Sequence, residues 1–330
     1  MTPLVVADHV SKHFPTRGLF QRQRSVQAVT DVSFSVSRGE AVGLVGESGS
    51  GKSTIGRLLL GLTRPSAGRV LVDGTALTAA RGGAQRALRR RMQLVFQDPF
   101  SSLDPRRRVG DQIADGLAIH GLAKRSEQPE RVEGLLRQVG LEPAHAQRYP
   151  HEFSGGQRQR IGIARALSTG PDFLVADEPV SALDVSVQAQ VLQVLADLRT
   201  RLGLGLLFIS HDLPVVRSLC DRVIVLYLGR IMEEGPAADV LANPLHPYTR
   251  ALLSAAPSFD AARRRTRILL AGEPPSPADP PSGCVFRTRC PWAIADCATA
   301  TPPLRGSAAH RSACIRDDLN AIPMALEKTL

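Results

Sequence analysis

The ten residues from Val45 to Thr54 constrain the fold of this chain more than any other stretch. They read Val45-Gly46-Glu47-Ser48-Gly49-Ser50-Gly51-Lys52-Ser53-Thr54, between the apolar run Ala41 to Leu44 and a second apolar run that begins at Ile55. A strand, a glycine-rich loop that ends in Gly-Lys-Ser, and a helix form the order that a phosphate-binding P-loop requires. The stretch therefore predicts a nucleotide site in an α/β fold.

Each part of this loop has a chemical role toward a polyphosphate. The glycines let backbone N–H groups turn inward, and the start of the helix adds the positive end of its dipole. We expect Lys52 to lie against the β- and γ-phosphates, Ser53 to give its hydroxyl to Mg²⁺, and Thr54 to bond a neighbouring phosphate. A plain glycine turn before a helix is the alternative, and the flanking strand and helix argue against it.

The length and composition allow one large core. The chain has 330 residues, of which 43% are apolar, as expected for a globular protein with an appendage. No apolar run approaches the roughly 18 residues that cross a bilayer, and the N-terminus lacks the basic region, apolar core and cleavage site of a signal peptide. We therefore expect the chain to be made and kept in the cytoplasm.

The formal charge of +10 is compatible with nucleic acid, with an anionic membrane surface, or with solubility alone. Much of the excess lies in short arginine clusters at Arg86 to Arg91, Arg106 to Arg108 and Arg263 to Arg265. Few aromatic residues are interleaved with them to stack on bases. We therefore expect no nucleic acid partner.

The N-terminal residues predict strands near the loop. Leu4 to Val10 reads as a strand, and Phe14 follows it closely. An aromatic side chain there either stacks on adenine or plugs the end of the strand. The arginine-bearing segment Thr16 to Ser25 reads as an exposed loop, and the alternation from Val32 to Val36 predicts a half-buried strand.

Three further apolar strands each end in polar residues. They are Met92 to Phe96 with Gln97, Phe173 to Ala176 with Asp177 and Glu178, and Leu206 to Ile209 with His211. Because parallel strands end at one edge of a sheet, we expect these side chains to lie beside the P-loop.

Each of these polar side chains fits a step of phosphoryl transfer. We expect Gln97 to join Mg²⁺ and the attacking water, and Asp177 to orient Mg²⁺ through its water shell. Glu178 is positioned to accept a proton from that water, and His211 to bond the γ-phosphate or to hold the water and base. Capping or other structural roles are the alternatives for each residue taken singly.

A helical segment separates the first two of these strands. Apolar residues recur at helical intervals from Val109 to Gly140, which predicts an inserted helical subdomain over about residues 100–170. It leads to Ser154-Gly155-Gly156-Gln157 and a further helix, for which Ser154 suits the N-cap. This is a second anion-binding helix start. Because one chain rarely needs two phosphate cradles for one nucleotide, we expect it to serve a nucleotide held by another subunit in a sandwich dimer.

These motifs together resemble the ATP-binding subunits of ABC transporters. The elements that carry the resemblance are the P-loop, Gln97, the signature Ser154 to Gln157, the pair Asp177 and Glu178, and His211. The signature is the discriminating piece, because other P-loop enzymes lack it. The resemblance implies that ATP and Mg²⁺ are bound, that Phe14 stacks on adenine, that Asp184 forms the D-loop, and that the dimer is head-to-tail.

A closer resemblance covers almost the whole chain. Phe96 to Pro99, Phe153 to Arg160, Ala176 to Ser186, His246 to Thr249 and Gly272 to Pro277 look like the ATPase subunits of oligopeptide/dipeptide importers, especially their F subunit. This implies ATP hydrolysis that powers import of di- and oligopeptides or similar small solutes. The implied partners are a homologous ATPase subunit, two transmembrane permease subunits and an extracytoplasmic solute-binding protein, with this chain at the cytoplasmic face of the inner membrane.

Several alternatives stay open at this point. Importers for nickel, glutathione or glycosides have similar ATPase subunits, because the permease and binding protein choose the solute. A soluble nucleic-acid-associated ABC ATPase usually carries two ATPase modules, and this chain has one. A sugar importer would have a strand-rich barrel as its tail.

The last part of the chain differs in character from the ATPase region. We divide it into an ATPase domain at 1–242 and a loop-rich appendage at 243–330, which holds 12 of the 24 prolines. Four of the five cysteines, Cys284, Cys290, Cys297 and Cys314, lie in the appendage, whereas Cys220 falls in a predicted helix. Clustered cysteines in a cytoplasmic chain indicate a metal rather than disulfides.

Similar importer subunits carry this cysteine spacing, in some with an iron–sulfur cluster, which implies a structural [4Fe–4S] cluster. The proline after Cys290 is compatible with it. Zinc, or free thiols, are the alternatives. We expect the ATP site, in a different domain, to survive loss of the cluster.

Overall fold

Two β-sheets organise the chain in the computed structural model, which describes residues 3–15, 25–255, 268–307, 309–316 and 318. The larger sheet has the strand order β11-β12-β10-β9-β3-β8-β7-β6, and the smaller has the order β2-β1-β4-β5. The strands of the larger sheet are β3 Ala41–Val45, β6 Met92–Val95, β7 Phe173–Asp177, β8 Gly205–Ile209, β9 Arg222–Tyr227, β10 Arg230–Pro236, β11 Arg305–Gly306 and β12 Arg311–Ser312. Those of the smaller are β1 Pro3–Pro15, β2 Ser25–Ser37, β4 Ala67–Val72 and β5 Thr75–Ala76.

The middle of the larger sheet is parallel. Strand β3 pairs with β8 and β9, and β7 pairs with β6 and β8, all in parallel. Every residue of β3 and β8 is buried, because elements cover both faces of the sheet. Strands of this kind read as continuous apolar runs, and the strands expected in these places are confirmed.

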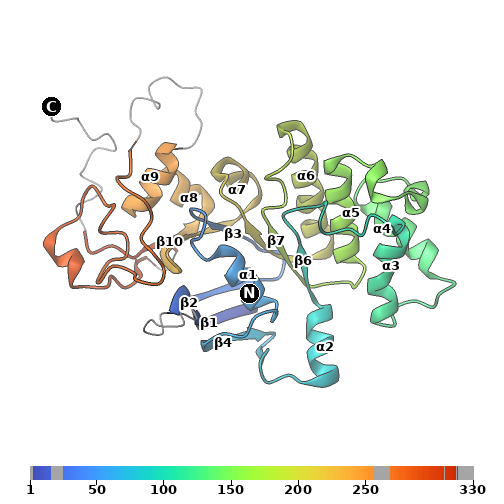
Figure 1. Cartoon of the computed structure of the whole chain (residues 1–330), viewed down its shortest axis with the longest axis horizontal. Coiled ribbons are helices and arrows are strands. Elements are labelled where there is room, and N and C mark those ends of the chain that lie inside the picture. The colour runs from blue at the N-terminus through green and yellow to red at the C-terminus, as the bar shows by residue number, and fades with distance from the viewer. Residues whose placement is uncertain (1–2, 16–24, 256–267, 308, 317, 319–330) are drawn as a thin grey trace, which may run out of the picture.

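Helices and the smaller sheet cover the two faces of the larger sheet (Figure 1). One face packs against the first helix and the antiparallel sheet, where Ile55 and Leu58 share a core with Val5 and Val36. The other face packs against helices that follow β6, with Ile163, Val191 and Val216 in a second core. The helices are α1 Lys52–Leu59, α2 Gly82–Arg90, α3 Val109–Ile119, α4 Gln128–Gln138, α5 Gly155–Leu167, α6 Val185–Leu202, α7 Leu213–Leu219, α8 Ala237–Ala242 and α9 Pro247–Ala255. The α/β fold class expected from the sequence is confirmed.

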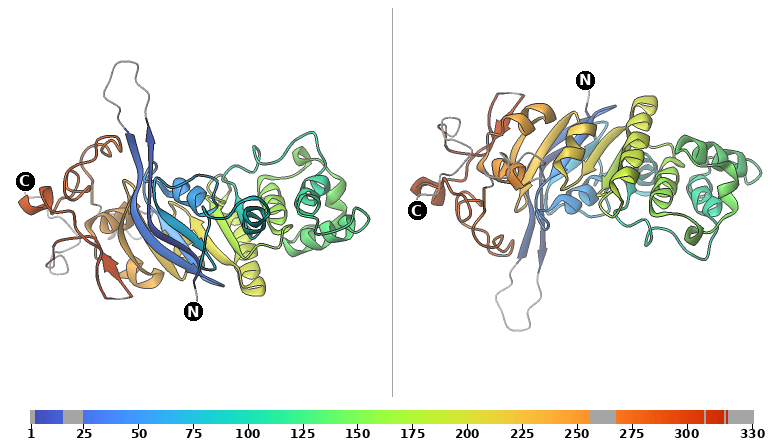
Figure 2. Two further views of the ribbon diagram at one scale, coloured as in Figure 1. Left: turned by 90° about the horizontal axis from the view of Figure 1, so that it is seen from below. Right: turned by 90° about the horizontal axis from the view of Figure 1, so that it is seen from above.

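The predicted helical insertion contains α3, α4 and α5, with two 3₁₀ turns at Pro143–Gln147 and Pro150–Glu152 between the last two. It forms one end of the molecule, and the C-terminal segment lies at the other end (Figure 2). The predicted P-loop, at the start of α1, lies between these ends. Cys220 is buried as expected, but it follows α7 as the C-cap residue instead of lying inside the helix.

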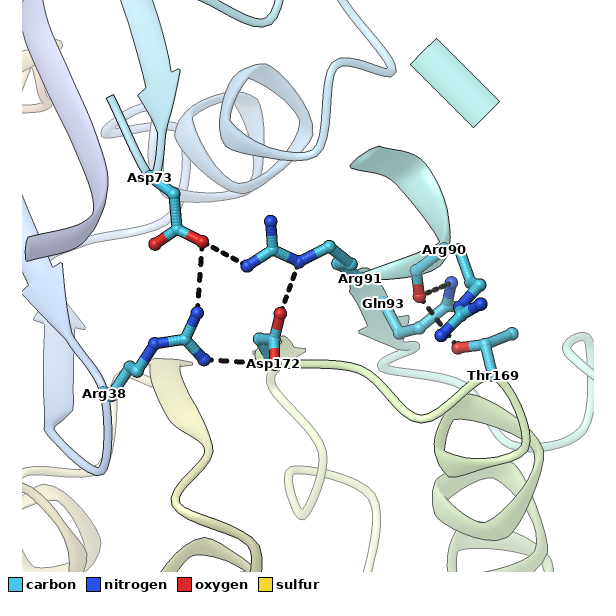
Figure 3. A network of polar contacts seen from close by, with 7 residues as sticks. All are labelled: Arg38, Asp73, Arg90, Arg91, Gln93, Thr169 and Asp172. Atoms are coloured by element: carbon cyan, nitrogen blue, oxygen red, sulfur yellow. Dashed lines mark hydrogen bonds and ion pairs between the residues drawn. The ribbon is translucent and has the colours of Figure 1, made fainter. Parts of the chain in front are cut away.

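Four charged side chains join the two sheets at the amino ends of β6 and β7 (Figure 3). Arg38 donates to Asp73 and to Asp172 at 3.1 Å each, and Arg91 also bonds both carboxylates. Asp73 belongs to the turn after β4, whereas Asp172 directly precedes β7. This network, which we call the amino-edge network, ties the antiparallel sheet to the parallel one on the side away from the P-loop.

The C-terminal segment extends the larger sheet. Strand β12 pairs with β10, and β11 pairs with β12, so residues 305–306 and 311–312 continue the sheet of the ATPase region. Apart from α9 and a 3₁₀ turn at Ala295–Ala298, the rest of the described segment has loop structure, as the prolines predict. The domain boundary at 242 stays a prediction.

Within the described ranges, no helix combines the length and apolarity needed to cross a membrane. Most of the predicted loop at residues 16–25 and the arginine cluster at 263–265 lie outside the residues that the structure describes.

Candidate functional site

A cavity of about 630 Å³ lies at the carboxyl edge of the parallel strands. Three groups of residues line it: the P-loop and the start of α1, the residues after β6, β7 and β8, and two stretches from elsewhere in the chain. They are Ser48, Gly49, Gly51, Lys52, Ser53 and Thr54; Gln97, Glu178 and His211; and Val26, Ala28 and Pro277. The structure thus brings most of the predicted hydrolytic residues to one place. A cavity of about 410 Å³ between α1 and α2 has arginines but no carboxylate in its lining.

The P-loop has a backbone that only glycine tolerates at its turn into α1. Gly51 has a φ of +104°, and a Cβ there would lie 2.3 Å from the carbonyl oxygen of Ala28. The buried Lys52 ammonium donates to the carbonyl oxygens of Gly46 at 2.8 Å and Glu47 at 2.9 Å. Burial lowers the pKa of Lys52, and the nearby carboxylates of Glu178 and Asp177 oppose that change. The cation therefore lies at the cavity wall among oxygen acceptors.

Ser53 and Asp177 form the candidate magnesium site. The Ser53 hydroxyl donates to Asp177 Oδ1 at 3.1 Å, which joins the start of α1 to the end of β7. Burial raises the pKa of Asp177, and the hydrogen bond from Ser53 acts in the opposite direction. A hydroxyl beside a carboxylate matches the oxygen ligands that Mg²⁺ prefers, so these residues fit the ion.

Glu178 lies at the centre of the polar cluster opposite the P-loop. Its Oε2 accepts a hydrogen bond from Gln97 Nε2 at 3.0 Å, and its Oε1 lies 3.4 Å from Nδ1 of His211. Its φ of +46° is unusual for a residue with a side chain. The strand end thus turns sharply at Glu178, whose carboxylate meets residues from two neighbouring strands.

The signature residues do not line this cavity. Ser154 caps α5 as predicted, because its hydroxyl accepts the N–H of Gln157 and its own N–H donates to Gln157 Oε1. Helix α5 packs on the start of α6, where a Cβ at Gly156 would lie 2.1 Å from a methyl of Val187. Asp184 is the N-cap residue of α6, so it lies beside the signature and also outside the cavity.

Two family models match the chain. The model for ABC transporters matches residues 29–181, and the model for the C-terminal region of oligopeptide/dipeptide transporters matches residues 232–297. A relative from Brucella ovis is 57% identical over 319 residues, which cover 96% of this chain and 99% of that protein. This chain belongs to the ATP-binding subunits of ABC transporters, in the oligopeptide/dipeptide group.

Other comparisons agree with this family. The di/tripeptide transport ATP-binding protein DppF of Pseudomonas aeruginosa is 47% identical to this ABC ATPase over 95% of the chain and 98% of its own length. Among solved structures, the dimeric ATP-binding cassette MJ0796 in a post-hydrolysis state with ADP and Pi has a TM-score of 0.63 and 29% identity, over 71% of this chain and 98% of that one. The fold is therefore that of an ABC ATPase with a helical insertion and a C-terminal appendage.

Besides the signature residues and Asp184, four further predicted nucleotide-binding residues do not line the cavity of the ABC ATPase. They are Phe14, Gly46, Glu47 and Ser50. Phe14 is 41% exposed, has the Lys12 ammonium 5.0 Å from its ring centre, and faces Val26 across the β1–β2 pair. It is therefore a cross-strand neighbour of a lining residue.

Sequence reasoning missed the contribution of the tail to this cavity. Pro277 lies in the lining, and its carbonyl oxygen accepts the N–H of Gln27 at 2.9 Å. The proline-rich motif from Gly272 to Pro277 was the available signal, because it belongs to the resemblance with importer subunits. Its place beside β2 depends on the tertiary fold.

The four tail cysteines line a common cavity with Arg287 and Arg316. The backbone N–H of Cys284 donates to the carbonyl of Cys297 at 2.9 Å, which holds these two residues together. Burial, with a smaller effect of the neighbouring thiols, raises the pKa of Cys290 to about 12. As the side chains stand, no group of three or more His, Cys, Asp or Glu in the described part of the chain is arranged to hold a metal ion.

Proposed function

We propose that this ABC ATPase hydrolyses ATP to drive the import of di- and oligopeptides through a membrane permease. The observation that carries the proposal is the convergence of Lys52, the Ser53–Asp177 pair and the Gln97–Glu178–His211 cluster on one cavity. The di/tripeptide transport protein of Pseudomonas aeruginosa, named above as a relative, supports peptides as the solute. Nothing in the nucleotide site itself selects the solute, because the ATPase is separate from the transport pathway.

The side chains divide the work of hydrolysis between them. Lys52 and the P-loop N–H groups bind and neutralise the phosphates. Ser53, Asp177 and Gln97 would hold Mg²⁺, which neutralises charge on the phosphate oxygens when bound. Glu178 accepts a proton from the attacking water, while Gln97 and His211 hold its carboxylate in position. Positioning and electrostatics thus supply the catalysis.

Lys52→Ala tests the nucleotide site directly. Loss of the buried ammonium should weaken binding of Mg²⁺-ATP by at least about tenfold, because a charge-assisted contact to phosphate is lost. Titration of the purified full-length chain with a fluorescent ATP analogue measures this. Affinity equal to that of the unmodified chain would contradict the P-loop assignment.

The signature supports a dimer with a homologous ATPase subunit. Ser154 to Gln157 form a capped helix start with N–H groups suited to anions, yet they lie outside the chain's own cavity. We infer that this helix start completes the ATP site of the partner in a head-to-tail dimer. Asp184, beside it, would lie at the dimer interface.

A groove between α1, α3 and the loop after β6 supports the contact with the permease. It has a volume of about 640 Å³, and Leu62, Phe96 and Ile119 contribute to its wall. These three side chains are 58%, 48% and 58% exposed, which is unusual for apolar residues of this size. We infer that the chain works with two permease subunits at the cytoplasmic face of the inner membrane, one of which docks in this groove, and that an extracytoplasmic solute-binding protein delivers the peptide.

We further infer that Cys284, Cys290, Cys297 and Cys314 hold a [4Fe–4S] cluster of structural function. Four thiols at one cavity match the ligand number, and the guanidinium groups of Arg287 and Arg316 would balance the negative charge of a thiolate-bound cluster. Binding requires the thiols to lose their protons and to turn toward a common centre. Zinc is the alternative for the same ligands.

A further inference from the structure

Glu47, the second residue of the predicted phosphate loop, is held by groups from three directions. Its backbone N–H donates to the hydroxyl of Tyr248 at 2.8 Å, and its carboxylate lies 2.7 Å from Nη1 of Arg289. Its carbonyl oxygen accepts the Lys52 ammonium at 2.9 Å. Tyr248 and Arg289 both belong to the C-terminal segment, 201 and 242 residues away in the chain.

Both tail residues are fixed in place. Tyr248 is fully buried, and its ring lies 4.8 Å from that of Tyr227 and 5.3 Å from that of Phe286. The side chain of Arg289 is only 8% exposed, and its Nη1 also lies 3.5 Å from the hydroxyl of Tyr227. A buried guanidinium needs a charged partner, and Glu47 supplies it. The aromatic cluster thus forms a rigid support for two contacts to the P-loop.

These two contacts do not compete with a nucleotide. Neither Tyr248 nor Arg289 lines the nucleotide cavity, so they reach Glu47 from behind the loop. Lys52, by contrast, lines the cavity and is the residue expected to bind the phosphates. Tyr248 and Arg289 hold the N–H and the carboxylate of Glu47, and with them the next loop residues, in position. Preorganised N–H groups bind phosphate more tightly, because less order is lost on binding.

We propose that Tyr248 and Arg289 are positioning residues for the P-loop, through which the C-terminal segment sets the affinity of the chain for ATP. The proposal rests on the nucleotide site proposed above. Pro277 also lines this cavity and contacts Gln27, so a second part of the C-terminal segment lies at the nucleotide site. The contacts with Glu47 bear on the expectation that the ATP site survives loss of the cluster, because they join the segment that holds the four cysteines to the P-loop.

The test is binding of a fluorescent ATP analogue to full-length variants. Arg289→Ala should weaken binding by roughly tenfold, and Tyr248→Phe by roughly threefold, because each removes one contact to Glu47. In the assembled transporter, the KM for ATP should rise while kcat changes little, since Gln97, Glu178 and His211 are untouched. Arg289→Lys should recover part of the affinity.

Arg311→Ala is the matched control. Arg311 lies in the same C-terminal segment as Arg289, but it pairs with Glu234 of β10 instead of a residue of the P-loop. It should bind the analogue like the unmodified chain. A double-mutant cycle removes the concern that a variant merely loosens the fold. Glu47→Ala should weaken binding about as much as Arg289→Ala, and the two together should weaken it little further.

The outcomes separate this proposal from the nucleotide site itself. If the unmodified chain does not bind the analogue, or Lys52→Ala binds it equally well, the proposed ATP site is wrong. If Lys52→Ala loses binding while Arg289→Ala and Glu47→Ala keep it, the positioning role is wrong. The positioning role is also wrong if the losses of affinity of Glu47→Ala and Arg289→Ala add up fully in the double variant. If Arg289→Ala does not fold, Tyr248→Phe and Glu47→Ala carry the test, and unchanged affinity in both overturns the proposal.

Discussion

At the scale of single residues, Glu178 has the most demanding position in the nucleotide site. It leaves β7 with a positive φ of +46°, and its carboxylate meets Gln97 from the end of β6 and His211 from the end of β8. A positive φ strains the backbone of a residue that has a side chain, and functional residues commonly adopt such strained conformations. A carboxylate held between an amide and an imidazole suits a general base.

Glu178→Gln should keep ATP binding and lose most turnover. The amide has nearly the same shape but cannot accept the proton of the attacking water, so kcat should fall by about 10²- to 10⁴-fold. Hydrolysis by the assembled transporter and analogue binding by the purified chain measure the two effects separately. Near-normal hydrolysis by Glu178→Gln would show that another residue is the general base.

At the scale of elements, the amino-edge network joins β4, β6 and β7 through ion pairs (Figure 3). Burial alone would raise the pKa of Asp172, but the hydrogen bonds and charges of Arg91 and Arg38 outweigh it and hold that pKa below its ordinary value. Because the pKa is lower in the folded chain, the network stabilises the fold above the unfolded pKa of about 3.9. That stabilisation is lost as the pH falls through the folded pKa.

Asp172→Asn should lower the free energy of unfolding by about 1 to 2 kcal/mol at neutral pH, a modest value because the groups are partly exposed. The difference from the unmodified chain should shrink as the pH falls below about 4. Urea unfolding at several pH values measures it. Asp115→Asn, which breaks an exposed pair with Arg107, is the control and should cost about 0.5 kcal/mol or less. Equal losses of unfolding free energy in the two variants would show that the network stabilises the fold no more than an exposed ion pair does.

The capped start of helix α5 lies outside the chain's own cavity. A substitution at Ser154 should therefore affect the ATP site of the partner subunit. Ser154→Arg puts bulk and charge where we place the partner's γ-phosphate, and hydrolysis at the partner's site should fall strongly while binding at the variant's own P-loop persists. A transporter with one variant subunit, assayed for binding and turnover at each site, distinguishes the two. Loss of binding at the variant's own P-loop would contradict the sandwich arrangement.

At the scale of the whole molecule, three contacts of the C-terminal segment with the ATPase region bear on the fold and the nucleotide site. Strand β12 extends the larger sheet, Pro277 borders the nucleotide cavity, and Arg289 with Tyr248 holds Glu47. A loop-rich segment with few apolar periodicities needs cross-links to be ordered. The four cysteines lie where such a cross-link would fix the segment that carries Arg289.

Anaerobically purified protein should therefore be brown and contain about four iron and four acid-labile sulfide atoms per chain. The double variant Cys284→Ser and Cys297→Ser should lose the iron and the sulfide. Cys220→Ser should keep them, because Cys220 is buried beside α7 and lies far along the chain from the other four cysteines. Iron and sulfide analysis measures this. Colourless protein with zinc, or with no metal, would show that the cluster assignment is wrong.

The sequence by itself determined the elements whose signals are local. The P-loop, the buried strands β3, β7 and β8 and the capped start of α5 were all predicted, because apolar runs, glycine spacing and capping residues act over a few neighbours. The cluster of Gln97, Glu178 and His211 was predicted as well, since parallel strands end at a common edge.

Only the tertiary structure decided which distant groups support these motifs. Glu47 belongs to the predicted P-loop, but its contacts with Tyr248 and Arg289 connect it to residues that no local pattern links to the loop. The amino-edge network joins Arg38 to Asp172 over 134 residues in the same way. Side-chain partners of this kind depend on how loops close over the sheet, and loop closure leaves no periodic signal in the sequence.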